Sequence, residues 1–200
     1  MHRTRLMSAF LAPVAIVSLS SCGVNSIPTA EEEAKAKWAD VQAAYQRRAN
    51  LIPNLVATVK GAAASEQNIL VGVTNARASA TRVTVTGDQL TDPNALARFA
   101  DAQNRVTLSL QRLQEAYPQL QSQGNFKTLM DELEGTENRI NIAIRDYNGA
   151  VQAYNTRIRT FPDVIGAKIF YGAKPMATYQ ATTPNAEQAP AVSFDTNTSR

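Results

Sequence analysis

Four stretches of this sequence place apolar residues on alternating steps of three and four, the spacing that gathers side chains on one face of an α-helix. Because each stripe has to be buried against another element, four stripes with short connections predict an all-α fold, an antiparallel up-and-down four-helix bundle. No stretch shows a β-strand alternation of comparable quality. The stripes comprise Ala34, Trp38, Val41, Tyr45, Ile52, Leu55 and Val59; Ile69, Val73, Ala76, Ala80 and Val83; Leu96, Phe99, Val106, Leu110, Leu113 and Tyr117; and Phe126, Leu129, Leu133, Ile140, Ile144, Tyr147, Val151, Tyr154, Ile158 and Phe161.

Capping residues and prolines predict where these helices begin and end. Thr29 and Glu32 have the spacing of a capping box, so we expect the first helix to begin at Thr29. Asp92-Pro93 supplies an N-cap and a first-turn proline for the third helix. We therefore expect the bundle to occupy residues 29–172, including a short apolar piece after Pro162 that folds back over one end.

The first stripe contains two features that interrupt a regular helix. Pro53 lies beside the stripe, where it removes one backbone hydrogen bond, so we expect a long, kinked first helix. Gly61, with Ser65 as a following N-cap, predicts a reversal into a second helix. The apolar phase is nearly continuous across that turn, which leaves one very long helix as the alternative.

The N-terminus has the form of a bacterial lipoprotein leader. Arg3 and Arg5 precede an apolar stretch over residues 6–19, which is too short to cross a bilayer. The stretch ends before Ser20-Ser21-Cys22, which resembles a lipobox. We expect residues 1–21 to be a signal peptide, Cys22 to be acylated, and residues 22–28 to form a tether. The protein is then expected on the extracytoplasmic side of the envelope, and on the outer membrane facing the periplasm in a Gram-negative host.

The residue inventory excludes several function classes. Without Arg3 and Arg5, the 20 basic residues fall to 18 against 17 acidic residues, and no basic cluster remains for nucleic acid. The single histidine, His2, lies in the leader, and the single cysteine is Cys22. Histidine-based and cysteine-based catalysis and metal binding are therefore not expected in the mature chain, and no cofactor or catalytic residue is predicted.

Several sequence blocks resemble the LemA family. The most specific runs from Tyr45 to Gly61 and reads YQRRANLIPNLVATVKG; later matches are Ala76-Arg77, Tyr117-Pro118, Asn125-Phe126, residues 133–140 (LEGTENRI), and the pairs Tyr147-Asn148 and Tyr154-Asn155. The resemblance covers roughly residues 38–173. It implies a membrane-held antiparallel four-helix bundle with no activity or ligand established for the family as a whole. Two departures are the lipobox in place of a transmembrane helix and Gly61-Ala62-Ala63 in place of an aromatic-containing segment.

Three polar residues fall where the apolar stripes are interrupted. Arg48 lies on the first stripe, Gln103 on the third, and Glu137 on the fourth. Counted from the same end of the predicted bundle at ~1.5 Å per residue, they reach one level. We predict a buried polar layer centred on an ion pair between Arg48 and Glu137, of the kind that sets helix register. A ligand site at this level is the alternative.

Two further residues are candidates for contact with a partner. Trp38 lies near the start of the first helix, and Arg47 belongs to an arginine pair suited to acidic groups. The default interpretation is that Trp38 packs in the core and that the charge of Arg47 is solvated. Carboxylates near Glu134 are interpreted as a solvated acidic face because bundle metal sites also use histidine. No metal site is predicted.

Residues 173–200 are rich in Pro, Ala, Thr, Asn and Ser and contain few apolar anchors, so we expect a disordered tail. The whole pattern predicts a non-catalytic lipoprotein that acts as a helical scaffold or interaction module. Its expected partners are the membrane, through lipid on Cys22, and an envelope or membrane protein, but not nucleic acid or metal. The alternative function is a carrier or chaperone-like module that binds an apolar segment or helix in a groove.

Overall fold

The computed structural model describes residues 25–62 and 67–181. Within these two ranges the chain forms helices and no β-strand, which confirms the all-helical class. The long helices are α2 (Ser26–Ala62), α3 (Gln67–Arg82), α4 (Pro93–Ala116) and α5 (Gly124–Arg157). Shorter helical segments are η1 (Gly87–Thr91), η2 (Pro118–Ser122), α6 (Asp163–Gly166) and η3, a π-helical turn (Ala167–Tyr171).

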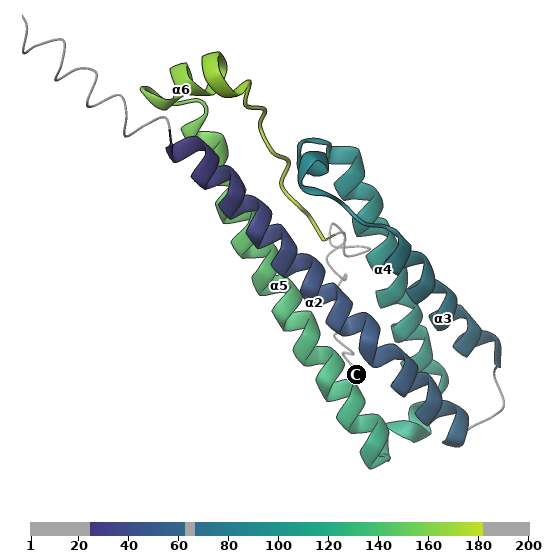
Figure 1. Cartoon of the computed structure of the whole chain (residues 1–200). Helices are drawn as coiled ribbons and strands as arrows, with labels where there is room; N and C mark the ends of the chain where they lie inside the picture. Colours follow the sequence, from purple (N-terminus) through teal and green to yellow (C-terminus); the bar gives the residue numbers. More distant parts are fainter. Residues whose placement is uncertain (1–24, 63–66, 182–200) are drawn as a thin grey trace, which may run out of the picture.

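The long helices pack as two pairs (Figure 1). The 37-residue α2 lies beside the 34-residue α5, and the shorter α3 lies beside α4. Because α3 turns back along α2, the chain reverses between Ala62 and Gln67. The predicted reversal is therefore confirmed and the single long helix is wrong, while the connecting residues 63–66 lie outside the described part of the chain.

Helix α2 begins one turn earlier than the capping box predicts. It starts at Ser26, and Thr29 donates its hydroxyl hydrogen to the Asn25 carbonyl at 2.8 Å instead of capping the helix. Pro28 is tolerated because the first N–H groups of a helix have no intrahelical acceptor. Ile27 is fully buried, which holds this extra turn on the core. Residues 26–28 are therefore helical, and the tether predicted over 22–28 is wrong at these positions.

Two apolar clusters fill the interior, one toward the start of α2 and one toward its end. The proximal core gathers around Trp38, Phe99 and Tyr147, and the distal core around Leu55 and Leu113. Three buried polar residues, Arg48, Gln103 and Thr136, occur at the sequence positions where α2, α4 and α5 pass from one core to the other. The apolar stripes are thus interrupted at a common level of the molecule.

The chain after Gly172 packs against the helices as an extended segment, here called the C-terminal strap (residues 173–181; Figure 1). Met176 and Tyr179 are buried, and Ala177 donates its N–H to the Leu90 carbonyl at 2.8 Å. The predicted disorder over 173–200 is therefore wrong for residues 173–181. Two apolar anchors suffice because most of the attachment uses the strap backbone. Residues 182–200 lie outside the described part of the chain.

Candidate functional site

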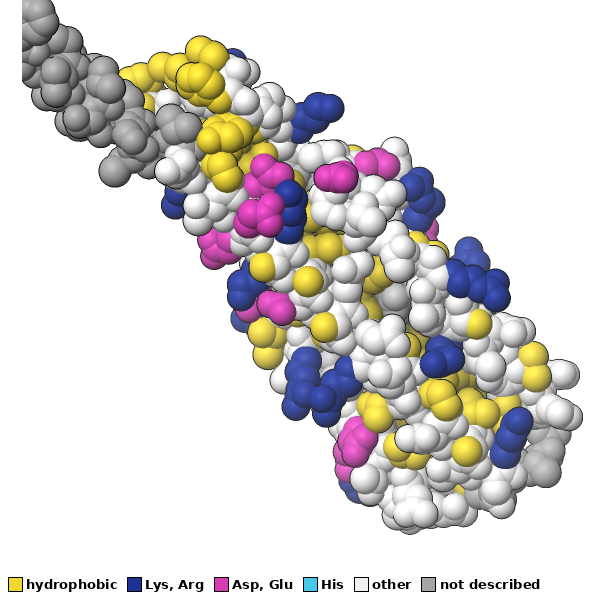
Figure 2. All heavy atoms as spheres, in the orientation of Figure 1, with side chains coloured by type: hydrophobic (Ala, Val, Ile, Leu, Met, Phe, Trp, Pro, Cys, Tyr) yellow, Lys and Arg dark blue, Asp and Glu magenta, His cyan; other side chains and the backbone are white. Residues whose placement is uncertain are grey.

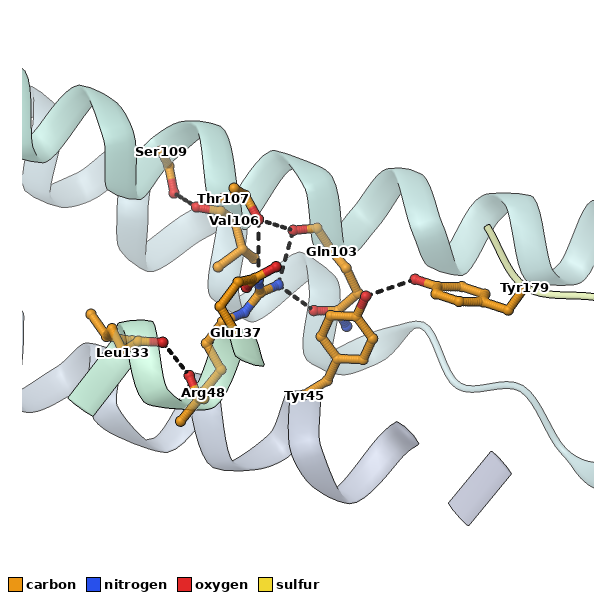
Figure 3. A network of polar contacts seen from close by, with 10 residues as sticks. Tyr45, Arg48, Gln103, Val106, Thr107, Ser109, Leu133, Glu137 and Tyr179 are labelled. Atoms are coloured by element: carbon orange, nitrogen blue, oxygen red, sulfur yellow. Dashed lines mark hydrogen bonds and ion pairs between the residues drawn. The ribbon is translucent and has the colours of Figure 1, made fainter. Parts of the chain in front are cut away.

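The Arg48 guanidinium lies at the centre of a polar network between α2, α4 and α5 (Figure 3). Its Nη1 donates to Thr107 Oγ1 at 3.1 Å and to Glu137 Oε2 at 3.0 Å. Its Nη2 donates to the backbone carbonyl and to Oε1 of Gln103, both at 3.1 Å. Each Nη carries two hydrogens, so all four are engaged by groups of the same chain.

Gln103 and Glu137, the other residues of the predicted polar layer, each contact Arg48, but the three side chains are unequally buried. The Arg48 side chain is 4% exposed, whereas the Glu137 side chain is 47% exposed. The expectation of an ion pair that is buried on both sides is therefore wrong. Glu137 reaches inward from the edge of α5 and keeps one side in solvent, so its ionised form needs no further internal partner.

Two tyrosines connect this network to the C-terminal strap. The Arg48 guanidinium carbon lies 5.0 Å from the centre of the Tyr45 ring, within the range of a cation–π contact. The hydroxyls of Tyr45 and Tyr179 are 2.9 Å apart (Figure 3). Burial raises the pKa of both phenols above the ordinary value of 10.0. Both tyrosines are therefore neutral hydrogen-bonding groups at physiological pH.

Two asparagines of α5 hold the backbone of the strap. Asn155 donates from Nδ2 to the Met176 carbonyl at 2.8 Å, and its Oδ1 accepts from the Met176 N–H at 2.9 Å. Asn148 makes the same pair of bonds with Tyr179, each at 2.8 Å. Each amide thus satisfies one donor and one acceptor of a strap residue, as a neighbouring β-strand would.

The spacing of these bonds follows from helix and strand geometry. Asn148 and Asn155 are seven positions apart on α5, which is a rise of about 10.5 Å. Three extended residues of the strap span about 10 Å. The same match holds for Tyr147, which donates to the Ala177 carbonyl at 2.8 Å, and for Tyr154, which donates to the Lys174 carbonyl at 3.1 Å. The two Tyr-Asn pairs therefore form one repeated clamp.

Arg77 on α3 compensates for the proline within α2. Pro53 has no N–H, so the carbonyl of Ala49, four residues earlier, loses its helical donor. Arg77 Nε donates to that carbonyl at 2.7 Å. The helix continues through Pro53 to Ala62, and the substitute hydrogen bond ties α3 to α2.

A small pocket adjoins the network between α2, α3 and α4. Its volume is about 80 Å³, and its walls include Tyr45, Arg48, Arg77 and Gln103. Small-molecule sites usually occupy about 300–1,000 Å³. This pocket therefore has room for only a few atoms. A second hollow on the α4–α5 side of the network, lined by Arg48, Thr107 and Glu137, has a volume of about 370 Å³, which is within the range of a small-molecule site.

The LemA family model matches residues 37–194, which is more than half of the chain. The chain belongs to the LemA family. The matched range contains the Arg48 network, both Tyr-Asn pairs and the strap. The LemA blocks noted in the sequence therefore include the residues that hold the strap and those that join α3 to α2.

Curated relatives of this LemA-family chain include magnetosome proteins. Magnetosome protein MamQ 2 and magnetosome protein MamQ 1 of Paramagnetospirillum magneticum are each 26% identical to it over 180 residues. Magnetosome protein MamQ of Magnetospirillum gryphiswaldense has the same identity over the same length. Each alignment covers 78% of this chain and 65% of the relative, so the chain spans just under two thirds of the length of these relatives.

The remaining predicted site residues of this LemA chain are not brought together. Trp38 is 2% exposed and packs edge-to-face against Phe99 and at a tilt against Tyr147, with ring centroids 5.3 and 5.1 Å away. Trp38 therefore packs in the core, as its default interpretation held, and the predicted partner contact is wrong for it. Arg47 is exposed on α2. Cys22 lies outside the described residues. In residues 25–62 and 67–181 no group of three or more His, Cys, Asp or Glu residues is arranged to hold a metal ion.

Sequence reasoning missed the strap contacts and Arg77. The repeat of a Tyr-Asn pair after seven residues was a usable signal, because it places two identical polar pairs on one side of a helix. An arginine on the helix following an internal proline was a weaker signal.

Among the described helices, none has an apolar stretch long enough to span a bilayer.

Proposed function

We propose that this LemA-family chain is a lipid-anchored helical scaffold of the cell envelope with no catalytic role. The single observation that carries the proposal is that the buried polar groups are hydrogen-bonded within the protein. Each buried side-chain nitrogen or oxygen in the described part of the chain has a hydrogen-bond partner, and the Arg48 guanidinium donates four bonds within its own fold. Buried groups that are paired in this way stabilise the fold and are not free to react with a substrate. Recognition of a partner would then use the outer surface.

Membrane attachment is proposed through acylated Cys22. The sequence supports it, since the cysteine follows an apolar leader and precedes the first helical residue, Ser26, by only four positions. The magnetosome proteins among the relatives support an association with a membrane. The extracytoplasmic face is the proposed side, which in a Gram-negative host is the periplasmic face of the outer membrane.

The proposed scaffold is an up-and-down antiparallel four-helix bundle. The pairing of α2 with α5 and of α3 with α4 supports this arrangement. Its proposed partner is a protein of the envelope or membrane, contacted by outward-facing residues such as Arg47.

The anchor is tested by labelling cells with an alkyne analogue of palmitate and separating membranes from soluble protein. We expect label and membrane fractionation in the wild type and in Ser21→Ala, which keeps a small residue before the cysteine. Both should be lost in Cys22→Ser. Normal labelling and membrane processing of the Cys22→Ser protein would remove the anchor from the proposal.

The scaffold role is tested by photo-crosslinking in the native host. A photoreactive phenylalanine is placed at one exposed position on each face, for example at Arg47 on α2, Val71 on α3 and Glu132 on α5. We expect a protein adduct of discrete mass from at least one face. Absence of any protein adduct from all faces would contradict a scaffold.

A second candidate, the carrier, is favoured by one groove between α3 and α4. It has a volume of about 410 Å³, and its lining includes the apolar residues Ile69, Val73 and Leu108 and the basic residues Arg105 and Arg112. That size falls in the range of small-molecule sites, about 300–1,000 Å³. A photoreactive residue at Ser109, which also lines the groove, distinguishes the two functions. Adducts of a lipid or peptide at Ser109 alone would favour the carrier.

A further inference from the structure

An apolar patch of unusual exposure lies at one end of the molecule. Its residues, here called the apical patch, fall within eleven consecutive positions of the sequence. The exposed fractions are 81% for Phe161, 50% for Ile165, 70% for Ile169, 70% for Phe170 and 42% for Tyr171. Figure 2 shows the corresponding apolar surface gathered at the end of the elongated molecule. An exposed apolar cluster of this kind marks an interaction surface.

The backbone that carries the patch is fixed to the helices by small residues. Gly166 and Ala167 are buried against the bundle, whereas the large side chains on either side of them point outward. Ala173 donates its N–H to the Ala167 carbonyl at 3.0 Å, and Gly172 adopts a φ of 54°, a left-handed conformation that favours glycine. The segment was predicted to fold back over one end of the bundle. Its small residues do pack against the helices, but its large side chains face solvent.

The patch lies at the same end as the start of α2. Ser26 donates its hydroxyl hydrogen to Asp163 Oδ2 at 2.8 Å, and Arg157 Nη1 donates to the Ser26 carbonyl at 3.3 Å. Cys22 precedes Ser26 by four residues, and four extended residues span at most about 14 Å. A lipid on Cys22 would therefore hold the apical patch within a short distance of the bilayer surface.

The charges within the segment that carries the patch are mainly basic. Exposed cations in and beside the segment are Arg157, Arg159, Lys168 and Lys174, against one carboxylate, Asp163. The start of α2 nearby carries Glu31, Glu32 and the exposed Glu33. The first two are paired with a cation, since Lys35 Nζ lies 2.8 Å from Glu31 and 2.9 Å from Glu32. Large apolar residues flanked by lysine and arginine are the composition of segments that lie in the interface of anionic membranes.

We propose that the apical patch enters the interfacial region of an anionic bilayer and forms a second membrane attachment beside the lipid on Cys22. The proposal rests on the anchor proposed above, because that anchor brings the patch to the membrane. Anchored by the acyl chains alone, the bundle would be free to tilt about its linker. Two attachments at one end hold its long axis away from the membrane plane.

The test uses the intact acylated protein reconstituted in vesicles of phosphatidylethanolamine and phosphatidylglycerol. Acylation blocks the thiol of Cys22, the only natural cysteine, so F170C can be labelled with the fluorophore NBD at a single site. The matched control is R47C, which is also exposed but lies 21 residues along α2 from Ser26, about 32 Å at the helical rise.

We expect lipids with doxyl groups on their acyl chains to quench NBD in F170C and to leave R47C unquenched. The blue shift of F170C emission should weaken when Lys168→Ser and Lys174→Ser are added or when the vesicles contain only phosphatidylcholine. Adding Phe161→Ser and Ile169→Ser should abolish quenching of F170C, since burial of one such side chain changes partitioning by about tenfold or more.

The outcomes separate the two proposals. A protein that does not float with the vesicles shows that the anchor has failed. A protein that floats but shows no quenching of F170C overturns the apical contact and leaves the anchor intact. Crosslinking of unlabelled F170C into dimers by a short bis-maleimide, with no quenching, would assign the patch to a second copy of this chain and would also overturn the proposal.

Discussion

Arg48 and Glu137 form an ion pair in which the two partners have different surroundings. The arginine side chain is 4% exposed and depends on protein acceptors for all of its contacts, whereas the carboxylate is 47% exposed. Water can therefore replace the arginine as a partner for Glu137, but nothing outside the fold can replace Gln103 and Thr107 as partners for Arg48.

This asymmetry predicts unequal effects of removing each partner. Arg48→Ala should lower the free energy of unfolding by about 2–5 kcal/mol, because it leaves a cavity and buried acceptors without donors at the junction of two apolar cores. Glu137→Gln should cost about 1 kcal/mol, as for a partly exposed pair. Urea unfolding monitored by circular dichroism measures both, with Arg47→Ala as the control, expected within about 0.5 kcal/mol of wild type. Equal costs for Arg48→Ala and Glu137→Gln would contradict the one-sided burial.

The contact between Tyr45 and Tyr179 predicts a loss of stability in alkaline solution. Burial raises the pKa of both phenols above 10.0, so the folded chain holds these protons more tightly than the unfolded chain. Their contribution is complete below the unfolded pKa and declines as the pH rises above about 10. In Tyr179→Phe the decline should be shallower, though Tyr147 and Tyr154, whose pKa values burial also raises, retain part of it. Urea unfolding between pH 7 and 11 would contradict this if the two proteins differed by a constant amount throughout.

Among the secondary-structure elements, the long helices were predictable from sequence because apolar residues at steps of three and four mark the buried face of a helix. The reversal before α3 was predicted from Gly61 and Ser65, although the apolar phase is nearly continuous across it. The common level of Arg48, Gln103 and Glu137 followed from helical rise, which converts sequence positions into heights. The strap was not predictable in this way. Its buried apolar side chains are Met176 and Tyr179, with the small Ala173 and Ala177 packed beside them, and its hydrogen bonds to the asparagines use backbone groups, which every sequence possesses. Trp38 was ambiguous because a stripe position identifies the buried face but not whether that face has an opening.

The strap predicts a strong dependence of stability on residues 173–181. Truncation after Gly172 should lower the melting temperature by several degrees, since it removes both asparagine clamps and the burial of Met176 and Tyr179. Truncation after Ala181 keeps every described contact and should leave the transition nearly unchanged. Differential scanning calorimetry of the two truncated proteins measures the effect, and identical transitions would show that the clamps contribute nothing.

Single substitutions can resolve the clamp further. Asn148→Ala and Asn155→Ala each remove two hydrogen bonds and should each cost about 2 kcal/mol. Gln152→Ala, at an exposed position between them on α5, is the matched control and should remain within about 0.5 kcal/mol of wild type. In the protein truncated after Gly172, the two asparagine substitutions should lose most of their effect, because their partners are absent.

At the scale of the whole molecule, the interior consists of a proximal and a distal core with a polar layer between them. Contact between side chains couples their energies, whereas distant sites act independently. Val41 belongs to the proximal core and Val59 to the distal core, and both are fully buried on α2.

The division into two cores predicts how substitutions combine in their effect on the free energy of unfolding. Substitutions on opposite sides of the layer should be additive, and substitutions within one core should be coupled. Val41→Ala and Val59→Ala should destabilise additively to within about 0.5 kcal/mol in the double variant. Trp38→Phe and Phe99→Leu, whose rings lie 5.3 Å apart in the proximal core, should show a coupling of about 0.5–1.5 kcal/mol. Urea unfolding of the two sets gives both quantities, and strong coupling between Val41 and Val59 would mean that the layer does not separate the cores.

The polar layer also bears on how the helices are aligned along their length. If α2 slid by one turn along its neighbours, the Arg48 guanidinium would move by about 5.4 Å, away from Gln103 and Glu137 and into an apolar core. Such a shift would break the four hydrogen bonds that the guanidinium makes, so the layer favours the observed offset of the helices. With 37 residues, α2 is about 55 Å long. With the proposed attachments at the Ser26 end, a molecule of this fixed length would hold its opposite end at a constant height above the membrane.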